Sequence, residues 1–209
     1  MDDIKKMIEA QRGALAAVLA ALPASRWDEP TLCAGWRVRE VVAHISMPFR
    51  YSVPRFLLEL ARSGGRFSLL SERIARRDAA RLSSDQLVRV LQDNVAHPWK
   101  PPGGGFAGAL THDVIHGMDI TVPLGLDRPI PADTIGLVLA NLATAKGMKY
   151  FGVDLSGVSL HATDIDWHYG SGAPVTGTAQ ILALLLCGRK LPPGHLTGAL
   201  SERFTGAGG

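Results

Sequence analysis

Cysteine is scarce in this chain of 209 residues, which holds only Cys33 and Cys187. Two cysteines cannot build the framework of several disulfides on which small secreted proteins depend, and reduced thiols are the rule inside cells. The N-terminus opens on acidic residues and lacks the cationic start and apolar core of a secretory signal peptide. We therefore expect a cytoplasmic protein.

Long apolar runs and a strong charge of one sign are also missing. The longest apolar run, residues 181–187, is far shorter than the ~20 residues that a membrane-spanning helix needs. Lys and Arg number 22 against 19 Asp and Glu, and the two signs are interspersed. Because nucleic-acid-binding domains usually carry a basic stripe, the sequence predicts neither a nucleic-acid partner nor a membrane partner.

Apolar residues recur at helical spacing through the first 150 residues, and turn-forming residues separate the periodic segments. This periodicity predicts helices over 3–22, 38–62, 84–97, 107–121 and 131–150. Pro48 and Pro54 lie inside the second segment and predict a kink or a break there. We expect residues 67–81 and 101–106 to form loops.

The pattern changes after residue 150. Residues 158–165 alternate and are rich in β-branched side chains, short strand-and-turn pieces follow over 167–176, and residues 178–187 form an apolar helix. The predicted fold class is therefore mainly α. A bundle of four or five helices occupies residues 1–152, and a small α/β C-terminal extension occupies residues 153–209.

Three of the seven histidines are placed to converge. His112 and His116 are four residues apart and so share one helix face, and His44 lies on the inward stripe of another predicted helix. Three neutral nitrogen ligands with an open position are typical of a catalytic site for zinc, or for a similar ion such as nickel. The alternative is a structural role for each imidazole, in the core or on a helix surface.

Two aspartates lie near these candidates. Asp113 is adjacent to His112, but on a helix its side chain should point about 100° away. Asp119 lies three residues after His116, where it would either accept a hydrogen bond from an imidazole N–H or cap the turn that follows the helix. We expect surface or structural roles for the other histidines, His97, His161, His168 and His195.

Three motifs resemble the mycothiol-dependent maleylpyruvate isomerase family, a DinB-like group of metal-binding four-helix bundles. The most specific is RWDEPTLCAGWRVREVVAH over residues 26–44. The second is HDVIHGMDI over 112–120, followed by PLG at 123–125, and the third runs from ATDIDW at 162 to the Gly-Arg pair at 188–189. The resemblance covers roughly residues 10–200.

This resemblance implies a DinB-like up-down four-helix bundle in which His44, His112 and His116 hold a divalent metal, with zinc the first candidate. The relatives that isomerise maleylpyruvate usually carry Glu where this chain has His112, which makes the site here one charge more positive. In the family, mycothiol is the cosubstrate and its thiolate attacks an electrophilic substrate. A metal with open positions lowers the pKa of a bound thiol, and it would equally activate water.

Arg189 is the candidate catalytic residue for pairing with a substrate carboxylate, because its guanidinium presents a bidentate fork. A charge at a helix end is the alternative for this residue. Cys33 is a candidate fourth ligand or nucleophile, although a small buried hydrophobe is the commoner fate of a free cysteine.

These observations together favour a metal- and thiol-dependent isomerase or transferase, which acts on a small-molecule thiol and an electrophile as a monomer or homodimer. The alternative hypothesis is a non-catalytic metal or small-molecule binding protein, such as a stress sensor, on the same scaffold.

Overall fold

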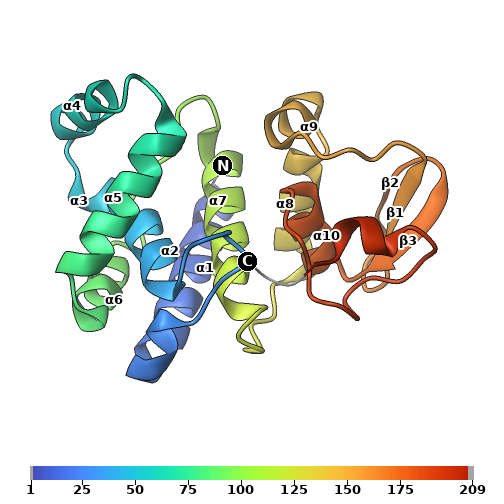
Figure 1. Cartoon of the computed structure of the whole chain (residues 1–209), viewed down its shortest axis with the longest axis horizontal. Coiled ribbons are helices and arrows are strands. Elements are labelled where there is room, and N and C mark those ends of the chain that lie inside the picture. Colours follow the sequence, from blue (N-terminus) through green and yellow to red (C-terminus); the bar gives the residue numbers. More distant parts are fainter. Residues whose placement is uncertain (1, 207–209) are drawn as a thin grey trace.

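The computed structural model describes residues 2–206, and it confirms the predicted fold class: a mainly helical protein with a small sheet near its C-terminus (Figure 1). The N-terminal helices are α1 (Asp2–Ala20), a short 3-10 helix η1 (Ala24–Asp28), α2 (Val38–Ile45), α3 (Met47–Arg50), α4 (Val53–Arg62), α5 (Phe67–Arg81), α6 (Ser84–Gln92) and α7 (Gly105–Thr121). After them come α8 (Ala132–Leu142), α9 (Ala145–Phe151), β1 (Val158–Ala162), β2 (His168–Gly170), β3 (Ala173–Gly177), α10 (Ala179–Leu186) and a second 3-10 helix, η2 (Ser201–Phe204).

The bundle is built by α1, α2, α5, α6 and α7. Helix α1 packs against α6 and α7, and α2 packs against α5 and α7, so α2 and α7 lie side by side in the interior. The apolar stripes of these helices meet in a buried cluster that also takes in the ring of Trp27. Burial of these stripes is the main stabilising term for such an arrangement.

The predicted break in residues 38–62 is confirmed, because this stretch forms the three helices α2, α3 and α4. Pro48 and Pro54 each stand in the first turn of their helix, where the missing backbone N–H removes no intrahelical hydrogen bond. The predicted helix over 131–150 is likewise divided into α8 and α9. Thr144 begins α9, and its side chain accepts a hydrogen bond from the backbone N–H of Gly147.

The prediction of a loop over residues 67–81 is wrong, since these residues form the 15-residue helix α5. Its buried face carries Leu70, Ile74 and Ala75, which share one side of the helix, and this face packs on α2. The arginines that make the segment read as polar lie mostly on the opposite, exposed face. The expected loop over 101–106 is also shorter than predicted, because α7 begins at Gly105.

The C-terminal sheet has the strand order β2-β1-β3. Strand β1 pairs antiparallel with β2 and parallel with β3, so that Leu160 lies opposite both Tyr169 and Val175. The predicted strand over 158–165 ends at Ala162, because residues 163–167 turn the chain back to β2. Helix α10 packs on β1 and on α8.

A single buried cluster joins α7 and α8 to α10 and the sheet. Figure 1 shows α8 beside α7, and α10 packs against both of these helices. The division that we predict between residues 1–152 and 153–209 therefore stays a prediction, since α8 shares its core with both parts.

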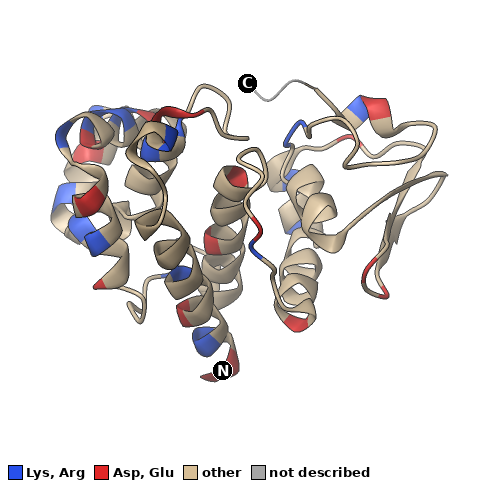
Figure 2. Ribbon diagram, turned by 90° about the horizontal axis from the view of Figure 1, so that it is seen from below, with Lys and Arg blue, Asp and Glu red and all other residues tan. Residues whose placement is uncertain are grey.

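Charged side chains are densest on α4 and α5, at the left of Figure 2. The arginines there alternate with acidic partners: Glu59 pairs with Arg73 and Arg77, and Glu72 pairs with Arg76. Across residues 2–206, no helix combines the length and the apolar character that crossing a membrane requires.

Candidate metal centre

The three predicted histidines lie together between α2 and α7. His44 stands in the last turn of α2, and His112 and His116 stand one turn apart on α7. One ring nitrogen from each histidine can be chosen so that all three nitrogens lie within 4.8 Å of one another. The Nε2 atoms of His44 and His112 are 3.4 Å apart. Two nitrogens on one tetrahedral zinc ion are about 3.3 Å apart, so this spacing fits a shared ion.

Each of the three rings is held at its other nitrogen. The Nδ1 atom lies 2.9 Å from Ser71 Oγ in His44, 3.0 Å from Asp113 Oδ1 in His112, and 2.9 Å from Asp119 Oδ2 in His116. The ionised carboxylates of Asp113 and Asp119 can only accept, so they favour a proton on Nδ1 of the rings they contact and leave the Nε2 lone pair free. The Ser71 hydroxyl does the same for His44 when it accepts from Nδ1. Outer partners of this kind orient the imidazoles of metal sites.

Burial favours the neutral, metal-binding form of His44 and His116. The pKa of His44 is lowered well below 6.5 by desolvation, and the neighbouring His116 and His112 lower it further. Desolvation also lowers the pKa of His116, against the opposing effect of Asp119. Because metal ions bind neutral imidazole, and because the nitrogen donors match zinc-type ions, the residues present fit a divalent metal.

Asp119 is the centre of a second set of contacts behind His116. Its side chain is fully buried, and it accepts hydrogen bonds from Arg189 Nε at 2.7 Å and Arg189 Nη2 at 2.8 Å. Burial alone would oppose ionisation, but the hydrogen bonds from Arg189 and His116 hold the pKa of Asp119 well below its usual range. Of the two roles considered for Asp119, the geometry favours that of partner to an imidazole.

Arg189 therefore lies beside the three histidines, yet two nitrogens of its guanidinium are occupied by Asp119. The remaining nitrogen, Nη1, lies 3.4 Å from the carbonyl oxygen of Cys187. A role in pairing with a substrate carboxylate stays a prediction, and any such contact would use the Nη1 side of the guanidinium.

Cys33 contacts the same carboxylate. Its Sγ donates a hydrogen bond to Asp119 Oδ2 at 3.0 Å and lies 3.7 Å from His116 Nδ1. Desolvation raises the pKa of this thiol far above its ordinary value, and the charge of Asp119 raises it further. The Cys33 thiol is thus protonated near neutral pH, which disfavours a role as thiolate nucleophile.

Two tryptophans form walls beside the histidines. The Trp36 ring lies 5.3 Å from that of His44, and the Trp99 ring lies edge-on to His112 at 5.0 Å. Trp36 belongs to the sequence motif over residues 26–44, whereas no motif or periodic pattern singles out Trp99. Trp27 is an anchor in the core and is almost fully buried.

Sequence spacing does not predict that Asp113 contacts the site. Helical geometry places its Cβ about 100° from that of His112, yet the carboxylate reaches back to His112 Nδ1. Of the remaining histidines, His161 and His168 stack across β1 and β2 at 6.0 Å between ring centroids, far along the chain from the candidate site.

Comparison with known proteins gives one family and one fold. The family model described as the mycothiol maleylpyruvate isomerase N-terminal domain matches residues 8–97. A crystal structure of the mycothiol-dependent maleylpyruvate isomerase is similar to this chain with a TM-score of 0.64 at 16% identity, covering 96% of this chain and 93% of the other. A histidine-to-alanine variant of that enzyme gives a TM-score of 0.62 at 15% identity with the same coverage. No curated protein sequence matches the chain.

Proposed function

Since residues 8–97 of the chain belong to the mycothiol maleylpyruvate isomerase N-terminal domain family, we propose that the chain is a metal- and thiol-dependent isomerase or transferase. In this proposal His44, His112 and His116 hold a divalent ion, zinc being the first candidate and nickel another. The observation that carries it is the convergence of three imidazoles whose Nδ1 atoms are all held by oxygens.

The bound ion would supply Lewis acidity, which lowers the pKa of a coordinated thiol to give a thiolate near neutral pH. The chain's own residues would prepare the place for it. Ser71, Asp113 and Asp119 keep the three rings in the orientation described above, and the walls of Trp36 and Trp99 exclude water from the reacting atoms.

The thiol in this proposal comes from a cosubstrate, and mycothiol is the thiol that the family name supplies. Cys33 is a poor source because its pKa is raised by burial and by Asp119. Cys187 is also a poor source, because burial raises the pKa of its thiol to about 12. Both cysteines are free, which agrees with the cytoplasmic location that we propose.

The electrophile would be a small maleylpyruvate-type acid. Arg189 is connected to His116 through Asp119, and we propose that its Nη1 side attracts a substrate carboxylate. We further propose a protein that works as a monomer or homodimer without nucleic-acid or membrane partners.

The test combines metal content with a thiol screen. The purified protein is loaded with zinc, its bound metal is measured, and consumption of mycothiol is followed against a panel of unsaturated and keto acids. We expect the wild type to bind about one zinc per chain and to consume mycothiol, as a three-ligand catalytic site would. His116→Ala should lose both properties.

Two other outcomes have defined meanings. Wild-type protein that cannot be loaded with zinc, nickel or a similar ion would refute the metal site. Protein that binds zinc tightly but consumes no thiol with any electrophile would favour the alternative of a non-catalytic metal or small-molecule binding protein.

A further inference from the structure

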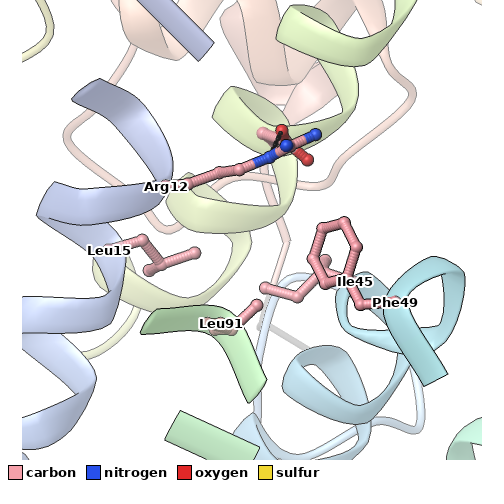
Figure 3. A pocket seen from close by; sticks show the side chains of 6 residues that line it. Arg12, Leu15, Ile45, Phe49 and Leu91 are labelled. Atoms are coloured by element: carbon pink, nitrogen blue, oxygen red, sulfur yellow. Dashed lines mark hydrogen bonds and ion pairs between the residues drawn. The ribbon is translucent and has the colours of Figure 1, made fainter. Parts of the chain in front are cut away.

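Arg12 is a buried cation that lies outside the site described so far. It belongs to α1, and only 4% of it is exposed. Figure 3 shows its side chain extending toward α7 at the edge of a small apolar pocket, which is lined by Leu15, Ile45, Phe49 and Leu91. An arginine in such surroundings needs a specific partner, because an unpaired buried charge is strongly unfavourable.

That partner is Asp113, and it leads directly to a candidate metal ligand. Arg12 Nε donates to Asp113 Oδ2 at 2.7 Å, and the other oxygen, Oδ1, lies 3.0 Å from His112 Nδ1. Each carboxylate oxygen therefore has its own partner. Because Arg12 holds Oδ2, the carboxylate is turned so that Oδ1 faces the imidazole.

Arg12 also contacts the segment that covers the other side of His112. Its Nη1 donates to the carbonyl oxygen of His97 at 2.6 Å. Two residues later, Trp99 places its ring against His112, and the Trp99 backbone N–H donates to His97 Nδ1 at 3.1 Å. One side chain of α1 thus contacts both the carboxylate that binds His112 and the segment that carries the aromatic ring packed against His112.

The same arrangement occurs at the second histidine of α7. His116 contacts Asp119, and Asp119 contacts Arg189. The arginines come from opposite ends of the chain, and each binds an aspartate of α7 that in turn bonds Nδ1 of a histidine. This repetition indicates that the Arg12–Asp113 pair serves the histidine and is more than a contact between α1 and α7.

We propose that Arg12 and Asp113 are positioning residues for metal binding: together they orient His112 so that its Nε2 faces the ion held with His44 and His116. This inference rests on the metal site of the proposed function. It extends that site by a second layer on α1, where Arg12 stands 101 positions before Asp113 in the sequence but contacts it directly in the fold.

The test measures metal affinity and coordination separately from turnover. Zinc dissociation constants come from competition with a chromophoric chelator, and the visible absorption of the Co²⁺-loaded protein reports the geometry of the ligands. The variants are Asp113→Ala, Arg12→Met and the double variant. Glu59→Gln is the matched control. The Glu59 carboxylate is buried and paired with arginine, as that of Asp113 is, but it contacts none of the three histidines.

We expect Asp113→Ala to weaken zinc binding by about 10–100-fold, the usual effect of losing an outer partner of a ligand. Arg12→Met should weaken it by about tenfold and change the Co²⁺ spectrum, and the double variant should resemble Asp113→Ala, since Arg12 acts through Asp113. Glu59→Gln should retain wild-type affinity. If Arg12→Met does not fold, Arg12→Lys takes its place, because an ammonium keeps the charge but cannot hold Asp113 and His97 in one planar fork.

The proposal is overturned if a folded Arg12 variant keeps the wild-type zinc affinity and Co²⁺ spectrum, or if Glu59→Gln weakens binding equally. Failure of the proposed function looks different. In that case the wild type itself binds no metal, or His112→Ala leaves its affinity unchanged.

Discussion

Arg189→Met should lower the free energy of unfolding of the metal-free protein by about 3 kcal/mol. The reason is that Asp119 is fully buried, and the substitution removes the cation that binds both of its oxygens. Breaking a buried ion pair from one side costs about 3–5 kcal/mol, because a buried charge is left uncompensated. We take the lower end of this range because Cys33 and His116 still hydrogen-bond to the carboxylate.

The size of the effect should depend on pH in a definite direction. In the wild type the folded-state pKa of Asp119 lies well below the unfolded value of 3.8, so its stabilisation is complete above that value and is lost as the pH falls through the folded pKa. Without Arg189, burial would raise the folded pKa above 3.8, and the ionised carboxylate would then destabilise the fold increasingly as the pH rises. The difference between variant and wild type should therefore be largest at pH 7 and shrink toward pH 4.

Urea unfolding in the presence of a chelator measures this difference, and thermal unfolding should show a melting temperature lowered by about 6–12 °C for a protein of this size. Arg203→Met is the control, since the Arg203–Asp154 pair is exposed and such pairs contribute less than about 1 kcal/mol. Adding Asp119→Asn to Arg189→Met should restore much of the lost stability. A loss below about 1 kcal/mol at pH 7, or one that does not shrink on acidification, would refute the reasoning.

Three further predictions concern the site and its surroundings. His116→Ala should weaken zinc binding by more than about 100-fold in a chelator competition, since it removes one of the three proposed ligands. Because burial lowers the pKa of His44 and His116, the folded chain should still bind zinc below pH 6.5. A short unfolded peptide with the same histidines should lose its zinc affinity at that pH, because its imidazoles become protonated. Titration calorimetry at pH 7.5 and 5.5 compares the two, and an equal loss of affinity in chain and peptide would contradict the prediction. Gly117→Ala should destabilise the fold by about 1–3 kcal/mol, because its Cβ would lie 2.6 Å from Arg128 Nη1, while Gly136→Ala on α8 meets no atom within 4 Å and should stabilise it by about 0.5–1 kcal/mol in the same urea assay.

The convergence of the three histidines could be predicted because local geometry dictates most of it. Four residues of helix bring His112 and His116 one above the other, and an inward stripe on a second helix is enough to bring His44 toward them. The helix breaks at Pro48 and Pro54 follow equally directly from the missing backbone donors.

Other features depend on contacts that sequence spacing does not contain. The sequence predicts a loop in place of α5 because its arginines mask a narrow apolar face, and this helix carries Ser71, the partner of His44. The Arg12–Asp113 contact joins residues 101 positions apart, and the Arg189–Asp119 contact joins residues 70 positions apart. The two ends of such a pair are unrelated in local pattern, and only the packing of α1, α7 and α10 brings them together.

The second layer of the site also has a consequence for its charge. Two carboxylates next to the imidazoles would by themselves neutralise a divalent ion, but Arg12 and Arg189 each offset one of them. An ion held by the three proposed histidine ligands would then keep its full double positive charge. Such a centre would favour thiolate over thiol and would attract an anionic substrate, while the carboxylates would still orient the rings through Nδ1. An aspartate alone would both orient its histidine and reduce the net charge at the metal. With an arginine paired to it, the aspartate would still orient the histidine but would no longer reduce that charge.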